Sequence, residues 1–175
     1  RPDAIAQPLG VYGASKYAGE QLVTQLLPES SVVVRTSWVY SSNGNNFVKT
    51  ILRLAKEKPQ IGVVADQIGS PTWAKGLADW LWAIAAKPEV QGVFHWSDAG
   101  VASWYDFAVA IQELGYEKGL LDKTIPINPI PTEAYPVPAC RPKYSVLNKS
   151  TAEQAAGIKT VHWRSQLAKM MDELK

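Results

Sequence analysis

Tyr12 and Lys16, near the start of the chain, have the types and the spacing of a proton-transfer pair. They lie four residues apart in the segment PLGVYGASKYAGEQLV, which is predicted to be helical, so both side chains would lie on one helix face. An ammonium group held near a phenol favours the phenolate form. Such a tyrosine can give a proton to a carbonyl oxygen or take one from an alcohol, and the lysine can hold sugar hydroxyls with its three N–H donors.

The small residues around this pair strengthen the interpretation, since the spacing alone also arises by chance. Gly13 and Gly19 lie in the same predicted helix, and each glycine costs a helix about 1 kcal/mol relative to alanine. That cost favours a function in which another molecule or segment comes close to the helix backbone.

The rest of the chain alternates between predicted strands and helices. Three consecutive valines at 32–34 are typical of a strand buried on both faces, which favours a parallel sheet. We therefore predict an α/β fold with a largely parallel sheet. The predicted order is helix, strand, helix, strand, helix, strand, helix, from the segments YGASKYAGEQLVTQLL (12–27), SSVVVRTSWVY, GNNFVKTILRLAKE, QIGVVADQIGSPT, WAKGLADWLWAIAAK, GVFHWSDAG and the helix after Val101.

Local signals define several element ends. Asn45 or Asn46 is predicted to cap the second helix. Ser103 and Asp106 form a capping pair that opens the fourth helix, and Gly115 is expected to end it.

Helical periodicity predicts the inward faces of the helices, whereas the proline-rich segment 126–142 is predicted to be an irregular ordered loop. The residues predicted to face the core are Phe47, Val48, Ile51, Leu52, Leu54 and Ala55 in the second helix, Leu77, Trp80, Leu81 and Ile84 in the third, and Trp163, Leu167, Met170, Met171 and Leu174 in a C-terminal helix.

The composition narrows the class of protein. A chain of 175 residues with 46% hydrophobic and 19% charged residues has the composition of a single soluble globular domain, and a net charge of +2 argues against nucleic acid as a partner. Cys140 is the only cysteine, so no disulfide within the chain is expected, and with His95 and His162 it gives too few ligands for a structural metal site. Without an apolar run of about 18 residues, we expect a cytoplasmic protein with no membrane partner. The two histidines are expected to be packed or capping groups.

Five segments in this order, YGASKYAGE, VVVRTSWVY, GNNFVKTILRLAKE, DQIGSPT and RPKYSVLN, resemble an extended short-chain dehydrogenase/reductase, and within that superfamily the dTDP-4-dehydrorhamnose reductase family. The resemblance implies hydride transfer from NADPH or NADH to the C4 ketone of a dTDP-linked deoxysugar, dTDP-4-dehydro-6-deoxy-L-mannose, which gives dTDP-L-rhamnose. It implies that Tyr12 donates the proton, that Lys16 binds the nicotinamide ribose with Tyr12 beside it, and that Trp38 packs on the sugar.

Several other candidate binding residues each have a functional and a structural interpretation. Lys49, Arg53 and Lys56 share a helical face that could meet a pyrophosphate or be solvated. Arg141 could reach the nucleotide or form a structural ion pair. Gln67 could contact the substrate or stabilise a turn.

The chain departs from the superfamily in its nucleotide-binding half. The glycines at 10, 13 and 19 do not have the spacing of a dinucleotide-binding turn, and no predicted strand precedes them. The chain also begins at Arg1 without a methionine. We therefore expect the C-terminal portion of a longer reductase, a single domain over 1–175 with its substrate-binding region within about 59–175, which is inactive alone because the main cofactor-binding motif lies outside it.

Two other functions stay open. The first is a sugar-nucleotide epimerase or dehydratase of the same superfamily, and the second is a non-catalytic binding or regulatory subunit on this fold. The resemblance is also compatible with a homodimer formed through the helix that carries Tyr12. The choice between NADH and NADPH is not defined by these residues.

Overall fold

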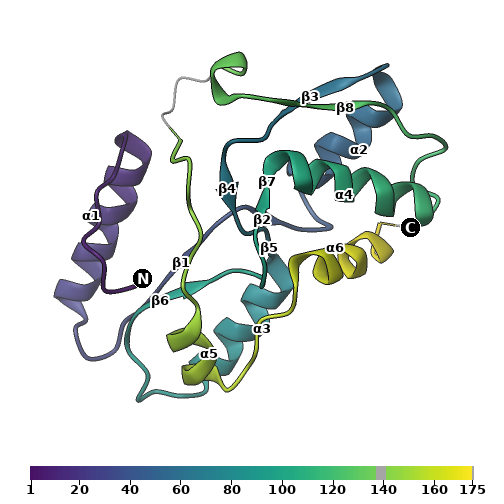
Figure 1. Cartoon of the computed structure of the whole chain (residues 1–175). Coiled ribbons are helices and arrows are strands. Elements are labelled where there is room, and N and C mark those ends of the chain that lie inside the picture. Colours follow the sequence, from purple (N-terminus) through teal and green to yellow (C-terminus); the bar gives the residue numbers. More distant parts are fainter. Residues whose placement is uncertain (137–140, 175) are drawn as a thin grey trace.

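The computed structural model of the chain describes residues 1–136 and 141–174, which form an α/β arrangement (Figure 1). Cys140 lies outside the described residues. The helices are α1 (Val11–Leu26), α2 (Phe47–Glu57), α3 (Ala74–Ala85), α4 (Trp104–Glu117), α5 (Ser150–Ala156) and α6 (Trp163–Asp172), with a 3₁₀ turn at Thr132–Ala134. The strands are β1 (Val32–Thr36), β2 (Val39–Tyr40), β3 (Ile61–Val64), β4 (Ile68–Gly69), β5 (Thr72–Trp73), β6 (Gly92–Trp96), β7 (Ala102–Ser103) and β8 (Ile127–Ile130).

Parallel pairing dominates among the described strands. The pairs β1–β6, β2–β5 and β3–β8 are parallel, and β4–β7 is antiparallel. β1 and β6 pair over their whole length, from Val32 opposite Gly92 to Thr36 opposite Trp96. The predicted α/β class with a largely parallel sheet is therefore confirmed.

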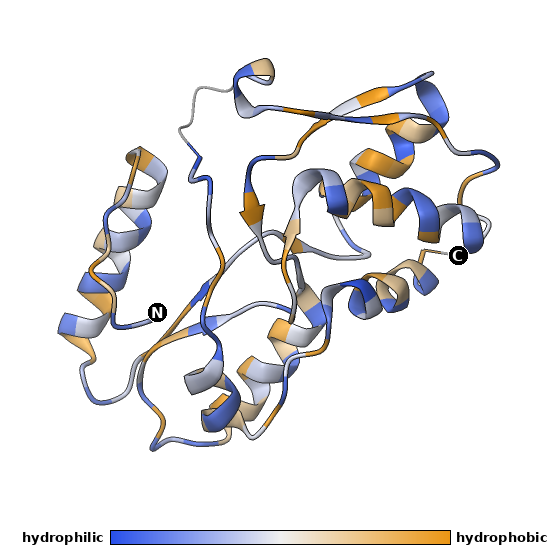
Figure 2. Cartoon of the chain, in the orientation of Figure 1, coloured by the Kyte–Doolittle hydropathy of each residue, from blue (hydrophilic) through white to orange (hydrophobic). Residues whose placement is uncertain are grey.

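The larger hydrophobic core lies where α2, α4 and α6 pack over the β3–β8 pair and the short central strands. Val48, Ile51 and Ala55 of α2 and Leu167 and Met170 of α6 are buried, as their helical spacing predicts. In Figure 2, hydrophobic and hydrophilic residues alternate along α2 and α4, as expected of helices with one buried face.

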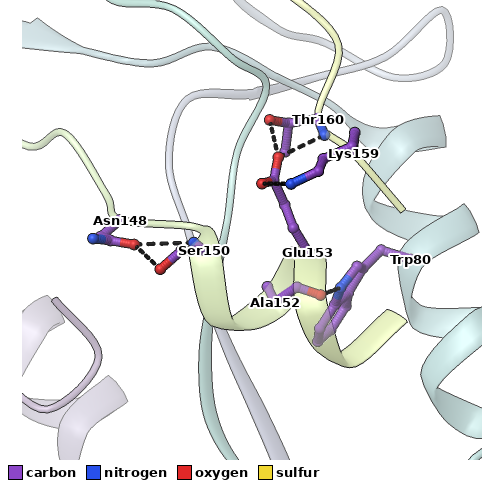
Figure 3. Close-up of polar contacts among 7 residues, drawn as sticks. All are labelled: Trp80, Asn148, Ser150, Ala152, Glu153, Lys159 and Thr160. Atoms are coloured by element: carbon purple, nitrogen blue, oxygen red, sulfur yellow. Dashed lines mark hydrogen bonds and ion pairs between the residues drawn. The ribbon is translucent and has the colours of Figure 1, made fainter. Parts of the chain in front are cut away.

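A second, smaller cluster surrounds Trp80 of α3, which packs on Phe94 and Trp96 of β6. The Trp80 indole also donates a 2.8 Å hydrogen bond to the Ala152 carbonyl of α5 (Figure 3). α5 is in turn tied to the following loop, because Glu153 accepts hydrogen bonds from the Thr160 amide and hydroxyl at 2.8 and 2.7 Å. This anchoring fixes the return path of the chain from residue 141 to α6.

α1 differs from the other long helices because none of its residues is buried. It stands at one side of the molecule, beside β1 (Figure 1). Its apolar side chains Val11, Leu22 and Leu26 are exposed. The described chain explains only one of the two helix glycines: a Cβ at Gly13 would lie 3.2 Å from Pro8 Cβ, whereas a Cβ at Gly19 would meet nothing within 4 Å.

The capping predictions are confirmed, and one predicted helix end is wrong. Asn46 accepts a hydrogen bond from the Lys49 amide at the start of α2, and Ser103 and Asp106 form a reciprocal capping box at the start of α4. Gly115 does not end α4, which continues to Glu117. Instead Gly115 is a site of close packing, because a Cβ there would lie 2.8 Å from Leu52 Cδ2.

Two other predictions need correction. Leu81 was expected to face inward but is 42% exposed, because α3 buries only the stripe that contains Trp80 and Ile84. The segment 126–142 is not irregular throughout, since residues 127–130 form β8 and pair with β3 despite Pro129. Among the described strands β8 pairs with β3 alone, and such an edge position is where a sheet tolerates proline.

Two glycine-to-alanine variants test these helix assignments. Gly19→Ala is expected to stabilise α1 by up to about 1 kcal/mol, because alanine is the better helix former and nothing obstructs its methyl group. The gain appears in the free energy of unfolding if α1 unfolds with the rest of the chain, and in the helix content alone if it does not. Gly115→Ala is expected to lower the free energy of unfolding by about 1–3 kcal/mol through overpacking against Leu52. Urea denaturation and far-ultraviolet circular dichroism measure both effects, and a neutral Gly115→Ala would contradict the packing described.

Candidate active site

The candidate site begins where two parallel strands end together. β1 ends at Thr36 and β6 ends at Trp96, and these two residues are partners in the register. The residues that follow, Ser37 and Trp38 after β1 and Ser97 and Asp98 after β6, therefore leave the pair at the same edge. Ligands of open α/β sheets gather beyond the carboxyl ends of the strands.

Tyr12 and Lys16 lie on a solvent-exposed face of α1. The Lys16 ammonium nitrogen is 5.5 Å from the centre of the Tyr12 ring, so the predicted pairing of the two side chains is present. Tyr12 is 77% exposed, and nothing within the described chain covers it. The pair is thus open to a ligand or to another part of a protein, and its catalytic role stays a prediction.

One ion pair ties α1 to β1. Arg35 of β1 and Glu20 of α1 form two hydrogen bonds, one from Arg35 Nε to Glu20 Oε2 at 2.9 Å and a shorter one from Nη2 to Oε1. Both side chains are partly buried. The hydrogen bond to Glu20 raises the pKa of Arg35, so the guanidinium stays charged. This bidentate contact sets the position of Tyr12 and Lys16 relative to the end of β1.

Trp38 lies in an aromatic cluster rather than beside Tyr12. Its ring stacks on Trp104, the first residue of α4, with centroids 3.6 Å apart and planes at 12°. Phe47, the first residue of α2, contacts the same Trp104 ring at 4.7 Å between centroids. Trp104 was not singled out from the sequence, because no local signal indicates which ring a tryptophan at a helix start will meet.

The backbone around Trp38 is held by the buried loop between β4 and β5. The Ser37 hydroxyl donates to the Ser70 carbonyl at 2.8 Å, and the Thr72 hydroxyl donates to the Ser37 carbonyl at 2.6 Å. The Thr72 amide donates to the Trp38 carbonyl at 3.2 Å. Gly69 lets the ring approach, since a Cβ there would lie 2.8 Å from Trp38 Cε2. The segment DQIGSPT thus positions Trp38.

A cavity of about 280 Å³ lies next to this cluster. Trp104 and Phe47 contribute aromatic surface to its wall, and Gln67 and Arg141 contribute polar groups. Its other wall residues are Thr50, Ile51, Leu54, Ile61, Gly62, Val63, Val64 and Tyr135. A mostly apolar hollow with a few polar groups has the character of a small-molecule site.

The structure places the remaining candidates as follows. Gln67 is buried and donates to the hydroxyl of the distant Thr132 at 3.1 Å rather than to a group in its own turn, and it also lines the cavity, so the substrate contact stays a prediction. Arg141 lies at the cavity wall. Arg53 is exposed and pairs with Glu57 at 2.7 Å, which is the solvated alternative predicted for that helical face.

Both histidines are structural, as expected. His162 caps α6 by accepting from the Arg164 amide at 3.3 Å. His95 is buried in β6 at 3% exposure, and among the described residues neither of its ring nitrogens has a hydrogen-bond partner. Burial lowers the pKa of His95 to about 4, so the ring is neutral at physiological pH. Among the described residues, no group of three or more histidine, cysteine or acidic side chains could hold a metal ion.

Asp98, which follows β6, is a buried carboxyl that sequence reasoning missed. It is 2% exposed and accepts a 3.0 Å hydrogen bond from the Trp73 amide. Burial raises its pKa to about 7, against the opposing effects of that hydrogen bond and of Lys149. Burial, together with Asp98, also raises the pKa of Tyr40. An acidic residue two positions after a buried strand is the sequence signal that could have identified Asp98.

Taken together, the paired parallel strands and the helices around them form a Rossmann-like α/β fold. The family model described as the RmlD substrate binding domain matches residues 1–175. The chain belongs to that family.

The chain is similar over nearly its whole length to curated proteins. It is 42% identical over 174 residues to the spore coat polysaccharide biosynthesis protein SpsK of Bacillus subtilis, a match that covers 99% of this chain and 58% of that protein. It is 40% identical over 176 residues to the dTDP-4-dehydrorhamnose reductase of Escherichia coli K12, covering 98% of this chain and 58% of the relative. The chain thus spans a little under three fifths of the length of these curated relatives.

Solved structures agree with this assignment. The crystal structure of dTDP-4-dehydrorhamnose reductase from Bacillus anthracis in complex with NADP superposes with a TM-score of 0.89 at 37% identity, covering 99% of this chain and 59% of the other. The UDP-N-acetylglucosamine 4-epimerase of Bacillus cereus superposes with a TM-score of 0.73 at 16% identity, a likeness in fold alone. In the described part of the chain, no helix is both long and apolar enough to cross a membrane.

The two buried titratable groups predict opposite pH dependences. The pKa of Asp98 is raised from 3.8 to about 7, so its contribution to stability is present below pH 4 and is lost as the pH rises towards 7. The pKa of His95 is lowered from 6.5 to about 4, so its contribution is present above pH 6.5 and is lost as the pH falls towards 4. The two effects oppose each other between these limits.

Asp98→Asn and His95→Phe separate these effects. Relative to the unsubstituted chain, Asp98→Asn is expected to gain stability as the pH rises from 4 to 7, and His95→Phe is expected to gain stability as the pH falls from 6.5 to 4. Urea unfolding at half-unit pH steps measures both difference curves. Difference curves that do not vary with pH would contradict the burial argument.

Proposed function

We propose that this chain forms the substrate-binding part of an NAD(P)H-dependent reductase that converts dTDP-4-dehydro-6-deoxy-L-mannose to dTDP-L-rhamnose. The observation that carries the proposal is the exposed Tyr12–Lys16 pair on a helix tied by Glu20 and Arg35 to the strand that leads to Trp38. Similarity to curated dTDP-4-dehydrorhamnose reductases at about 40% identity supports the same activity.

In this proposal Tyr12 donates its hydroxyl proton to the C4 ketone oxygen as the carbonyl becomes an alcohol. The positive charge of Lys16, 5.5 Å from the centre of the phenol ring, stabilises the phenolate that remains. Solvent access to this face of α1 lets the tyrosine regain its proton after each reaction. Trp38 offers an indole face against which the sugar ring packs.

The donor set on α1 fits a nicotinamide cofactor in part. The Lys16 ammonium is exposed and carries three N–H donors that suit the ribose hydroxyls, with the Tyr12 hydroxyl on the same helix face. When bound, the reduced nicotinamide supplies the hydride that attacks the sugar C4. The chain has no Gly-x-Gly-x-x-Gly turn for the cofactor's pyrophosphate, so this part alone is expected to bind the cofactor weakly.

The cavity lined by Phe47, Trp104, Gln67 and Arg141 suits the nucleoside diphosphate of the substrate. Aromatic walls can stack on a planar base, Gln67 can hydrogen-bond to it, and the Arg141 guanidinium can pair with a phosphate. The cavity draws on α2 as well as on residues 59–175, so the proposed substrate-binding region begins at Phe47. Arg53 lies outside the cavity wall and pairs with Glu57, which leaves Arg141 as the favoured phosphate contact.

A homodimer and a cytoplasmic location are also part of the proposal. The exposed apolar residues Val11, Leu22 and Leu26 on α1 support packing of this helix against another protein surface. Sedimentation equilibrium of the chain and of a Leu22→Glu variant tests the dimer. A monomer in both cases would remove this part of the proposal and leave the activity untouched.

Binding of dTDP to residues 1–175 tests the assignment of the cavity. We expect Arg141→Ala to weaken dTDP binding more than tenfold, because it removes a charge-assisted contact of about 1.5–3 kcal/mol. Arg53→Ala is the matched control, because it also removes one positive charge but lies outside the cavity wall. It should bind dTDP as the unsubstituted chain does. Isothermal titration calorimetry measures both, and equal losses in the two variants would contradict the assignment.

Turnover tests the role of Tyr12. In a polypeptide that joins the nucleotide-binding half of the Bacillus anthracis reductase to Arg1, we expect NADPH oxidation with dTDP-4-dehydro-6-deoxy-L-mannose, and a loss of about 100-fold or more in Tyr12→Phe. Tyr17→Phe, five positions further along the same helix, is the control that should keep activity. Residues 1–175 alone should oxidise no NADPH. A Tyr12→Phe variant with full activity would exclude Tyr12 as the proton donor.

A further inference from the structure

Trp38 has an unusual backbone conformation. Its φ of 50° makes it the only non-glycine residue with positive φ in the described part of the chain. Few L-amino acids adopt this left-handed region, and an aromatic side chain there is held by its surroundings rather than by local preference. The hydrogen bonds from Ser37 and Thr72 hold the backbone. The direction of the indole depends on what the ring contacts.

Trp104 is the ring that meets Trp38 face to face. The centroid distance of 3.6 Å and the interplanar angle of 12° mean that one face of the Trp38 indole is covered. A ligand can therefore meet Trp38 only on its other face or at its edge. The backbone of Trp104 is fixed by the capping box of Ser103 and Asp106, so its position is set by the start of α4.

The same Trp104 side chain also borders the cavity, whereas Trp38 is not among the cavity's wall residues. Phe47 contacts Trp104 and is likewise part of the wall. One indole thus lies between the proposed nucleotide pocket and the ring proposed to carry the sugar. A molecule bound in the cavity would contact Trp104, which in turn stacks on Trp38.

We propose that Trp104 is a positioning residue that couples occupancy of the cavity by a nucleoside diphosphate to the orientation of Trp38, and so to the placement of the sugar. This inference rests on the proposed function of the cavity. Coupling between two sites is reciprocal, so a sugar packed on Trp38 also strengthens binding of the nucleotide. The stack itself is the coupling element, and an aliphatic side chain at 104 would break it.

The first experiment follows the indole N–H signals of Trp38 and Trp104 by ¹H–¹⁵N NMR as dTDP is added to residues 1–175. Trp38→Phe and Trp104→Phe spectra assign the two signals. We expect both to shift with the same dissociation constant. In Trp104→Leu the Trp38 signal should no longer respond to dTDP, whereas in Trp104→Phe, which keeps an aromatic face, the response should be retained.

The second experiment compares dissociation constants for dTDP and dTDP-L-rhamnose, whose ratio measures what the sugar adds. Trp104→Leu is expected to reduce this ratio about fivefold, the lower end of typical coupling between sites, and Trp104→Phe is expected to restore it. Trp82→Leu is the matched control, because Trp82 is 78% exposed on α3 and touches neither site. Circular dichroism checks that each variant is folded.

The outcomes separate this inference from the proposal beneath it. If dTDP produces no signal change at any residue lining the cavity, both the nucleotide site and the coupling are wrong. If dTDP binds in the cavity while the Trp38 signal stays still, or shifts equally in Trp104→Leu, the coupling is wrong and the nucleotide site stands. The coupling would also be wrong if the ratio of the dissociation constants for dTDP and dTDP-L-rhamnose were unchanged in Trp104→Leu.

Discussion

The in-register parallel pairing of β1 with β6 is the constraint on which the candidate site depends. Because Thr36 and Trp96 end their strands side by side, Trp38 and Asp98 emerge at the same edge. Arg35, one residue before the end of β1, holds α1 through Glu20. A one-residue slip of this pair would send alternate side chains to the opposite faces, and the Arg35–Glu20 contact and the aromatic cluster could not form together.

This pairing costs free energy, because it buries polar side chains whose hydrogen-bonding groups are not all satisfied. His95 is buried in β6 without a hydrogen-bond partner among the described residues, and Asp98 is buried with a single backbone N–H bond and the nearby charge of Lys149. Native structures contain few such buried groups, and removing His95 and Asp98 from water costs free energy. Both follow from bringing the ends of two parallel strands into the interior.

The site has two parts that differ in how they are supported. The loop between β4 and β5 holds the Trp38 backbone, and α2, β3 and Trp104 border the cavity, so their geometry is determined within the chain. Tyr12 and Lys16 stand on a helix without a single buried residue, which one bidentate ion pair attaches to the sheet. The aromatic part is therefore suited to bind a small molecule. The Tyr–Lys part is exposed and is suited to contact a ligand or another protein surface.

The sequence by itself determined the features that depend on neighbours along the chain. The cap at Asn46, the capping box of Ser103 and Asp106, the buried face of α2 and the Tyr12–Lys16 pairing all follow from helical spacing and local hydrogen bonding. The motif order also identified the family. Only tertiary structure decided that Gly115 packs on Leu52, that β8 pairs with β3, that Trp104 stacks on Trp38 and that Asp98 is buried, because each of these depends on residues brought together from distant parts of the chain. The spacing of residues along the chain does not reveal such contacts, because they depend on which strands pair and in which register.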